Sequence, residues 1–511
     1  MEWRKKDKNF MNIVQTASTP DIFGDEYQDS NFEWSFVELS DRMKQYLHDD
    51  MAHSKPRKNL DRPIFYHTLD EPDDTRDIPA DMESGHRDSI APSDMYRHDD
   101  AGGSGSFPKT SISLNVTGAT RKTLQQSING WEFDLFALNG LTSGHALQAV
   151  AYEIFNQYGL LQKFRLTENH FMRFIVQVEK HYRHNPYHNS SHAADVLQTV
   201  NCIINRSGFI SLLTDLEIFC TLITAIVHDI EHTGTNNNFH KNSGSEMANM
   251  YVVSVLENHH LRVGLRMLRD YEILRTLSNE QYEDFKFMLT SMILATDMSN
   301  HFLLLTNMKL MMFAPIKGTS RIRIKRLLML LLHAADISNP AKPWDVHKVW
   351  VSLLCDEFFR QGDKEKELKL PVSPSCDRNS ANIATLQIGF MQTFTQDTFD
   401  VVDKMLEKEI KYAGRIYYPF TPWQECMIDN TIKWSGRWKD LKFEQINDLL
   451  METARSRKSI QPSFTKAPSG LRSEPLCCWP FRKPAKDVDV QAVLLSVLRP
   501  EEKESTVGEF D

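Results

Sequence analysis

The chain has 511 residues, of which 41% are hydrophobic and 25% charged, and its formal net charge is −9 at pH 7. The hydrophobic fraction suffices for a sizeable core in a soluble protein, and the acidic balance gives no electrostatic reason to expect nucleic acid as a partner. The longest apolar run, residues 327–332 with their neighbours, is far shorter than the roughly 20 residues of a membrane span. No apolar stretch follows the basic N-terminus, as a signal peptide requires, so we expect a cytoplasmic protein without a transmembrane segment.

Seven cysteines are scattered along the chain without a Cys-x-x-Cys pair. An odd, irregular set of this kind favours reduced thiols in the cytosol over a disulfide framework or a thiolate metal site. Cys477 and Cys478 adjoin aromatic and basic residues, so lipid attachment to these thiols, with peripheral association at a membrane, is one hypothesis. An unmodified tail is the simpler alternative.

Residues 1–122 contain runs rich in Asp, Pro, Gly and Ser. Such a composition buries too little surface to offset the entropy of the chain, and we expect a largely disordered regulatory region. A helix near residues 33–47 is expected within it, because four apolar residues recur there at helical spacing: Phe36, Leu39, Met43 and Leu47. This helix would pack locally, dock on the main domain, pair with a second copy in a homodimer, or bind a partner.

Residues 123–455 are rich in Leu, Ile, Met and Phe and are expected to form the main domain. Their apolar residues recur at helical spacing without the sustained alternation of a strand, which predicts an all-α domain of many short and medium helices. Pro and Gly residues mark the expected breaks between helices. Residues 456–511 are again interrupted by proline, and we expect a flexible C-terminal tail.

Histidine and aspartate residues recur in three separate stretches of this main domain. In two of them a pair of histidines is four residues apart, so the two would share one face if the stretch were helical. Imidazole suits Zn²⁺, whereas carboxylates also hold harder ions such as Mg²⁺, and a two-metal centre clamps both reacting oxygens of a phosphate ester. The pattern therefore predicts a hydrolytic centre for phosphoesters, built from His188, His192, His228, Asp229, His232 and Asp336.

These stretches belong to a longer series of motifs that resembles the class I 3′,5′-cyclic nucleotide phosphodiesterases. The motifs follow the family's order from Tyr187 to Phe390, and they read YHNSSHAADV, HDIEHTGTNNNF, VLENHH, LATDMS, HAADISNP, EFFRQGD and LQIGF. The resemblance implies a compact all-α catalytic domain of the HD superfamily type. It also implies a metal-dependent hydrolase that converts cAMP, cGMP or both to the nucleoside 5′-monophosphate and so terminates cyclic nucleotide signalling.

Carried over by position, the resemblance implies that zinc is bound by His192, His228, Asp229 and Asp336. Asp229 would also reach a second ion, Mg²⁺ or Mn²⁺, held otherwise largely by water. His188 would be the general acid that protonates the departing 3′ oxygen, a role that suits an imidazole charged near neutral pH.

Five further polar residues match those that surround the metal centre in the family. His232 and Glu257 are expected to take part in catalysis, and Glu257 would orient either His188 or the water network. Three others are expected to orient the ligands: Asn237, His260 and Thr296. For Asn237 and His260, capping of a loop or a helix end is the alternative.

The resemblance assigns recognition of the base to Gln387, whose amide can donate or accept a hydrogen bond and so can read a purine edge. Phe390 would stack on the base, and Leu354 would close the other side of the slot. The remaining wall of the pocket is expected to consist of Tyr187, Met298, Asn339, His347 and Trp350.

Within the family, the chain most resembles the calcium/calmodulin-dependent branch, through WEFDLFALN, HTGTNNNFH, AKPWDVH and GRWKDL. It departs from that branch at Asn339, where histidine is usual, at residues 251–253, and in an N-terminal region without the branch's calmodulin-binding and inhibitory elements. Residues 3–14, basic and apolar, are a candidate calmodulin-binding helix. The choice between cAMP and cGMP stays open, because the amide of Gln387 can turn over to suit either purine.

Two other functions are consistent with parts of this pattern. A His-Asp hydrolase could act on another nucleotide, but Gln387 followed by Phe390 favours a cyclic purine nucleotide. A binding or scaffold protein with a vestigial metal site would be expected to lack one or more ligands, and all four are present.

Overall fold

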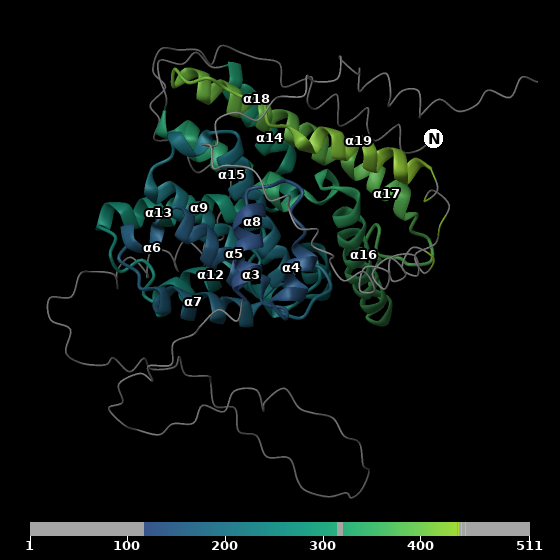
Figure 1. The fold of residues 1–511 in the computed structure, drawn as a ribbon. Helices are drawn as coiled ribbons and strands as arrows, with labels where there is room; N and C mark the ends of the chain where they lie inside the picture. Colours follow the sequence, from purple (N-terminus) through teal and green to yellow (C-terminus); the bar gives the residue numbers. More distant parts are fainter. Residues whose placement is uncertain (1–116, 314–319, 437, 439–440, 442–444, 446–511) are drawn as a thin grey trace, which may run out of the picture. The chain divides into compact units, whose positions relative to one another are not determined.

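The computed structural model describes residues 117–313, 320–436, 438, 441 and 445 (Figure 1). All regular elements of these residues are helical, which confirms the predicted all-α class. The α-helices are α3 (Gly118–Ser127), α4 (Leu135–Leu141), α5 (Ala146–Gln157), α6 (Leu160–Lys163), α7 (Glu168–His181), α8 (Ser190–Arg206), α9 (Asp215–Val227), α10 (Asn237–Ser243), α11 (Glu246–Met250), α12 (Val255–Asp270), α13 (Asn279–Leu294), α14 (His301–Phe313), α15 (Arg321–Asp336), α16 (Trp344–Glu367), α17 (Ile383–Phe390), α18 (Gln396–Tyr412) and α19 (Pro422–Ser435). Short 3-10 turns lie at η2 (Phe209–Leu212), η3 (Met298–Asn300) and η4 (Asn339–Ala341), and a π-helical turn at η5 (Met391–Thr395).

Helices α8 and α9 form the centre of the domain. Helix α8 packs against α5, α9 and α15, and α9 packs against α13 (Figure 1). From His192 to Ile204 every side chain of α8 is buried, and the same holds for α9 from Glu217 to Val227. A helix buried on all sides has little freedom to shift, so residues at the ends of α8 and α9 are held firmly.

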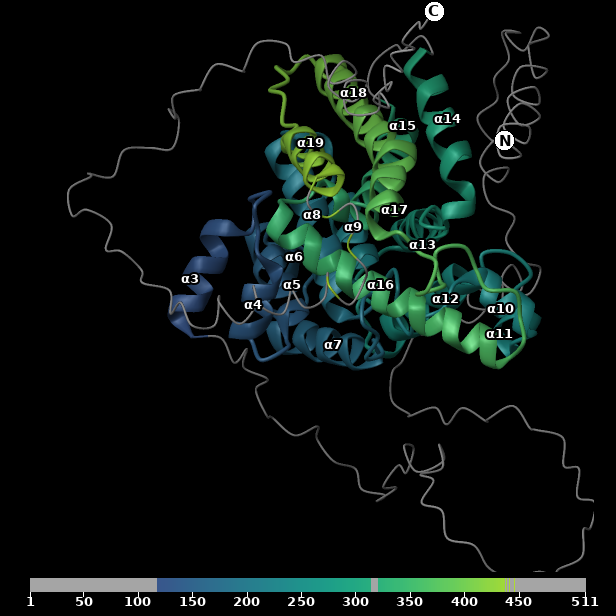
Figure 2. The same cartoon turned by 90° about the vertical axis from the view of Figure 1, so that its right-hand side faces the viewer.

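A second group of helices packs around the C-terminal half of the described chain. Helix α18 packs against α14 and α15, while α19 packs against α16 and α17 (Figure 2). Buried residues join α16, α17, η5 and α19 in one cluster: Val351, Cys355, Phe359, Ile383, Ala384, Met391 and Trp434. This cluster fixes α17, the helix that carries Gln387.

Neither histidine pair lies on a single helix, so the two histidines of a pair do not share a helix face. Helix α8 begins only at Ser190, because the side chain of Asn189 accepts hydrogen bonds from the first free N–H groups and caps it. His188 therefore precedes the helix that carries His192. Helix α9 ends at Val227, and Glu231 adopts a left-handed φ of 62°, so His232 lies in the following turn rather than on the helix.

The described helices extend slightly beyond the predicted limits of the main domain. Helix α3 begins at Gly118 and straddles the boundary predicted at residue 122. Both predicted tails, the helix near residues 33–47, residues 3–14 and the pair Cys477 and Cys478 lie outside the described residues, except for the first residues of α3. Their roles, homodimer formation included, stay predictions.

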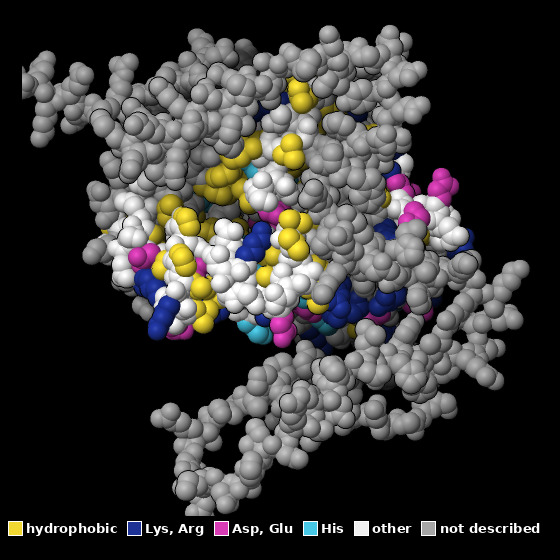
Figure 3. Space-filling model, turned by 180° about the vertical axis from the view of Figure 1, so that it is seen from behind, with side chains coloured by type: hydrophobic (Ala, Val, Ile, Leu, Met, Phe, Trp, Pro, Cys, Tyr) yellow, Lys and Arg dark blue, Asp and Glu magenta, His cyan; other side chains and the backbone are white. Residues whose placement is uncertain are grey.

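The surface of the described residues carries side chains of mixed character. Figure 3 shows a face on which basic and acidic side chains are mixed and hydrophobic side chains gather in small areas between them. Among the described helices, none combines the length and the apolar character that crossing a membrane requires.

Candidate metal centre and active site

Four predicted ligands from three helix ends converge on one point. His192 lies in the first turn of α8, His228 and Asp229 follow the last residue of α9, and Asp336 is the last residue of α15. One potential ligand atom from each of the four lies within 4.8 Å of the other three. Helix packing thus joins residues that are more than 140 positions apart in the sequence.

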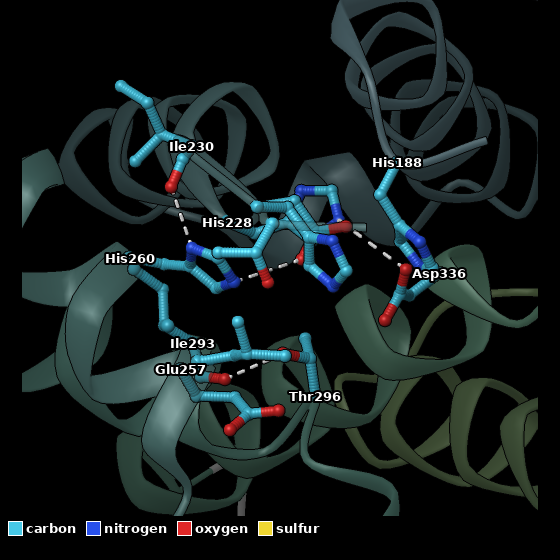
Figure 4. A network of polar contacts seen from close by, with 12 residues as sticks. His188, His228, Ile230, Glu257, His260, Ile293, Thr296 and Asp336 are labelled. Atoms are coloured by element: carbon cyan, nitrogen blue, oxygen red, sulfur yellow. Dashed lines mark hydrogen bonds and ion pairs between the residues drawn. The ribbon is translucent and has the colours of Figure 1, made fainter. Parts of the chain in front are cut away.

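The nitrogen and oxygen atoms of the cluster lie close together around a common centre (Figure 4). Nε2 of His192 lies 3.0 Å from Oδ1 of Asp336 and 3.4 Å from Oδ2 of Asp229. Nε2 of His228 lies 3.4 Å from each of the same two oxygens. Two imidazoles and two carboxylates offer the mixed nitrogen and oxygen donors that zinc and other divalent ions take.

The hydrogen bond and the pKa of His228 make this centre suitable for a cation. Its Nδ1–H donates to the backbone carbonyl of Ala225 over 3.0 Å, so Nε2 is the nitrogen that faces the two carboxylates. Burial lowers the pKa of His228, but Asp229 and Asp336 outweigh burial and hold it well above its ordinary value. The nitrogen thus requires a positive partner, and the site suits a divalent metal ion that competes with a proton.

His260 and Thr296 flank this cluster (Figure 4). Nδ1–H of His260 donates to the carbonyl of Ile230 over 2.7 Å, and its partnerless Nε2 lies 3.7 Å from Oδ1 of Asp229. Burial lowers the pKa of His260 to about 4, so the ring is neutral and Nε2 can accept a hydrogen bond. The hydroxyl of Thr296 donates to the carbonyl of Ile293 at the end of α13, which leaves its oxygen as an acceptor.

His188 forms a second polar group with Glu357 of α16. Its Nδ1 lies 2.5 Å from Oε1 of Glu357, whose Oε2 accepts the backbone N–H groups of Tyr187 and His188 over 2.9 and 3.0 Å. Burial lowers the pKa of His188, but the carboxylate outweighs burial and raises it to about 9. The imidazole is therefore charged near neutral pH, and its Nε2–H bond can donate a proton.

Sequence reasoning did not assign a role to Glu357, although the motif EFFRQGD contains it. It instead considered Glu257 as a residue that orients His188. In the structure Glu257 is bound by Asn237, whose Nδ2 donates to Oε2 over 2.9 Å and whose Oδ1 accepts the N–H of Leu256. Burial and the neighbouring Asp297 raise the pKa of Glu257 to about 8. Glu357 is thus the carboxylate that contacts His188.

The segment that departs from the calmodulin-dependent branch leads directly into Glu257. Ser254 adopts a left-handed φ of 45° just before α12 begins at Val255. Its hydroxyl donates to Oδ2 of Asp297 over 2.6 Å, and Asn258 Nδ2 donates to the carbonyl of Val253 over 3.0 Å. These bonds hold the unusual turn and put Glu257 in the first turn of α12.

The ring of His232 stacks on that of His188, with centroids 4.0 Å apart and planes inclined by 21°. Its Nδ1 accepts the N–H of Gly234 over 3.0 Å, so its proton is on Nε2. Burial and the nearby charge of His188 hold the pKa of His232 well below its ordinary value. A neutral ring therefore supports the charged ring of His188.

Sequence reasoning also missed Asn185, which joins the loop that carries His188 to the loop that carries His232. Its Nδ2 donates to the carbonyls of His188 and His232 over 2.9 and 2.7 Å. Gly234 has a left-handed φ of 71°, and a Cβ there would lie 2.8 Å from Oδ1 of Asn185. The dipeptide Asn185-Pro186 before the first histidine motif indicates a turn, but it does not reveal this long-range contact.

The predicted pocket residues come from several elements around the cluster. Tyr187 packs its ring against Trp350 and His192, with centroids 5.2 and 5.0 Å apart. Gln387 is buried in α17, Phe390 and Leu354 are half-buried, and Met298 is exposed. His347 is fully buried with both ring nitrogens engaged, by Asn339 and by Trp434. A ligand would therefore find no free nitrogen on His347.

Comparison with known proteins follows this geometry. Residues 187–414 match the family described as 3′5′-cyclic nucleotide phosphodiesterase. The dual specificity calcium/calmodulin-dependent 3′,5′-cyclic nucleotide phosphodiesterase 1 of Drosophila melanogaster is 45% identical over 289 residues, covering 56% of this chain and 34% of that protein. The human protein 1C of the same name is 44% identical over 289 residues (55% and 40%), and bovine 1B is 40% identical over 314 residues (60% and 58%).

The alignments thus span only 34% to 58% of the length of these relatives. A solved structure, that of LmjPDEB1 in complex with IBMX, matches with a TM-score of 0.55 and 29% identity, covering 62% of this chain and 97% of that one. The fold, the family match and the relatives confirm the resemblance drawn from the motifs. The similarity to the 3′5′-cyclic nucleotide phosphodiesterase family covers residues 187–414.

Proposed function

We propose that the protein is a metal-dependent phosphodiesterase that hydrolyses 3′,5′-cyclic nucleotides, cAMP, cGMP or both, to nucleoside 5′-monophosphates, and that residues 123–455 are its catalytic domain. One observation carries this proposal: a four-residue cluster suited to a cation lies beside a charged His188 that is held by Glu357. A cation site and a proton donor are the two parts that hydrolysis of a phosphodiester needs. The names of the relatives support the same reaction.

The metal would be held by His192, His228, Asp229 and Asp336. Two imidazole nitrogens with two carboxylates favour Zn²⁺ at this position, and the second oxygen of Asp229 would reach a Mg²⁺ or Mn²⁺ ion. When bound, such ions neutralise charge on the phosphate and lower the pKa of water, so that water attacks phosphorus near neutral pH. Glu257 and His260 are suited to hold that water, because the carboxyl of Glu257, with its raised pKa, can donate a hydrogen bond and the neutral ring of His260 can accept one.

His188 would supply the proton that the reaction consumes. The attack of water breaks the bond between phosphorus and the 3′ oxygen, and the departing oxygen takes the proton from Nε2 of His188. Glu357 keeps Nδ1–H directed toward itself and stabilises the charged ring before transfer. Water then returns a proton to His188, so that the products are a 5′-monophosphate and a free 3′ hydroxyl. His232 and Asn185 would keep the ring of His188 in position.

The base would bind between Phe390 and Leu354, with Gln387 reading its edge. Both apolar side chains are half-buried, so each keeps a surface for a ligand, and the helix α17 that carries Gln387 packs against the buried cluster. Tyr187, Met298, Asn339 and Trp350 would complete the wall.

Regulation by calmodulin is part of the proposal, because the relatives are named as calcium/calmodulin-dependent enzymes. Residues 3–14 are the candidate segment. We also place the enzyme in the cytoplasm, because the cysteines of the described residues are free thiols, four of them buried.

The test is steady-state hydrolysis of cAMP and cGMP by the full chain with Mg²⁺ and trace Zn²⁺, with and without Ca²⁺/calmodulin. Release of the 5′-monophosphate from either nucleotide, abolished by a chelator and restored by metal, is the expected result. A folded, metal-loaded chain that hydrolyses neither nucleotide would contradict the proposal, and linear nucleotides would then be tested as substrates of a different His-Asp hydrolase.

A further inference from the structure

Helices α14 and α18 pack against each other (Figure 2), and a groove with a volume of about 590 Å³ lies along them. Its apolar part consists of Met312 and Phe313 at the end of α14 and Val401 of α18. Phe313 is 84% exposed, and Leu310, one turn earlier on the same helix, is 63% exposed. Exposed apolar side chains that gather in this way mark a surface on which another segment binds.

The basic side chains of the groove gather in the C-terminal half of α18. Lys404, Lys408 and Lys411 line it there, together with one acidic residue, Glu407. Lys411 is paired with Glu407 over 2.6 Å, whereas Lys408 lies over the ring of Tyr412 and Lys404 is exposed. Contact with an aromatic ring leaves an ammonium group charged. This half of the groove therefore has an excess of positive charge beside its apolar part.

The charges in the N-terminal half of α18 argue against an anionic membrane as the occupant. Asp397 lines the same groove and is paired with Lys309 over 2.7 Å, and Asp400 and Asp403 are half-buried on the same helix. A flat anionic surface would meet these carboxylates as well as the lysines. A narrow segment can contact the basic half alone. The groove thus fits a stretch of polypeptide that combines apolar and acidic residues.

The C-terminal end of the chain has this combination. Residues 487–511 contain seven acidic residues and two basic ones. Eight apolar residues lie between positions 488 and 498, and five of the seven acidic residues follow them in 501–511. Residues 456–486, by contrast, contain seven basic residues and one acidic residue. Within residues 456–511, only the last part complements the groove in both charge and apolar character.

Attachment to the same chain favours residues 487–511 over a free partner. Helix α19 ends at Ser435, and 51 residues, 436–486, connect it to position 487. An extended flexible chain of that length spans about 40 Å on average, whereas a domain of this size has a radius of gyration of about 20 Å. The segment can therefore reach the groove, at an effective concentration on the order of millimolar.

We propose that residues 487–511 bind in the groove between α14 and α18 of their own chain. The apolar residues of 488–498 cover Met312 and Phe313, and the acidic residues of 501–511 pair with the lysines of α18. The interaction goes beyond the proposed function and does not depend on it, because none of the candidate catalytic or substrate-binding residues lines the groove.

The test is cross-linking of the full chain with a carbodiimide, which joins a carboxylate to an amine in direct contact, followed by mass spectrometry of the peptides. We expect cross-links within single chains from residues 501–511 to the lysines of the groove. The ion pair of Lys433 with Asp429 on α19 is the internal reference for the yield.

Reversal of charge in the groove should weaken the contact. In the chain that carries Lys404→Glu and Lys408→Glu together, we expect the yield of cross-links to Lys411 to fall about fivefold or more, because each exposed ion pair changes an equilibrium by up to about fivefold. The matched control is Lys366→Glu, since Lys366 is paired with Asp377 at the surface of α16. This control should leave the yield unchanged.

A second variant decides the matter if the groove variant does not fold by circular dichroism. Glu501→Lys with Glu502→Lys alters no residue of the described domain, and it should lower the same yield. Where the groove variant folds, combining the two pairs of substitutions should restore the yield. Cross-links from residues 501–511 only to lysines outside the groove, or only between two copies of the chain, overturn the proposal. So does a chain that gives none of these cross-links and binds vesicles of phosphatidylserine and phosphatidylcholine through the lysines of the groove.

Discussion

The four-residue cluster around His228 and the hydrogen bonds around His347 are both buried and polar, but they differ in how charge is balanced. In the cluster, His228 keeps an unpaired nitrogen beside two carboxylates, and its pKa is raised because the site lacks positive charge. By contrast, His347 is neutral and both of its nitrogens are paired. The comparison teaches that the proposed reaction would depend on charge that a ligand must complete, whereas the neutral dipoles around His347 are completed by the fold itself.

The largest effect is expected for Asp336→Asn, which should weaken metal binding by the cluster. An amide keeps the shape of the side chain but removes a negative charge and a good metal ligand, so we expect loss of metal and a fall in kcat/KM of more than the ~100-fold typical for a lost partner of a ligand. Metal content measured by atomic spectroscopy, together with the rate, checks this. Asp363→Asn is the control, because Asp363 pairs with Arg378 on the surface of the same domain. Full metal and full rate in Asp336→Asn would remove Asp336 from the site.

The next largest effect is expected for His188→Gln. Loss of a general acid costs about 10²- to 10⁴-fold in rate, and the loss should be much smaller for a nitrophenyl phosphodiester, whose leaving group needs no proton. The two substrates are compared at equal metal occupancy. His145→Gln serves as control, since His145 is an exposed residue that pairs with Glu179 of α7 and belongs to neither histidine motif. Equal losses for both substrates would show that His188 acts in some other way.

A smaller effect, with a defined sign, is expected for Glu357→Gln. Glu357 raises the pKa of His188, so its removal lowers that pKa, and the acid form is lost at lower pH. The alkaline limb of kcat against pH should move toward neutrality, with a rate loss of about 10- to 100-fold at neutral pH. Glu365→Gln is a matched control, because Glu365 is a buried carboxylate of the same helix that binds Ser373 and Gln361. A limb that stays in place would contradict the pairing.

Sequence reasoning reached the cluster more readily than its surroundings. The residue types and their motifs, each local in the chain, singled out His192, His228, Asp229 and Asp336, and the structure brings these four side chains together. The partner of His188 was missed, because Glu357 lies 169 residues away and only tertiary packing brings the two together. The two histidine pairs do not share a helix face for local reasons, since the cap at Asn189 starts α8 only after His188, and α9 ends at Val227, before His228 and His232.

The same reasoning explains what could be predicted of the fold. Helical periodicity was enough for the all-α class, because buried helices such as α8 and α9 carry strong apolar patterns. Helical periodicity could not predict the hydrogen bond between Trp434 and His347, because these residues are 87 positions apart and are joined only by the packing of α19 on α16. Asn339 was noted as a departure from related enzymes, but its orientation depends on that packing.

The smallest effect is expected for a substitution in the candidate pocket for the base. Phe390→Leu keeps an apolar surface but removes the aromatic face, so KM should rise about fivefold, within the range of base stacking on an aromatic side chain. Stacking does not distinguish purines, and KM should therefore rise equally for cAMP and cGMP. Phe313→Leu at the exposed end of α14 is the control. If Phe390→Leu changed the ratio of the two KM values, Phe390 would do more than stack on the base, and the contrast between the charged cluster and the neutral dipoles around His347 would have to include the packing of α17 itself.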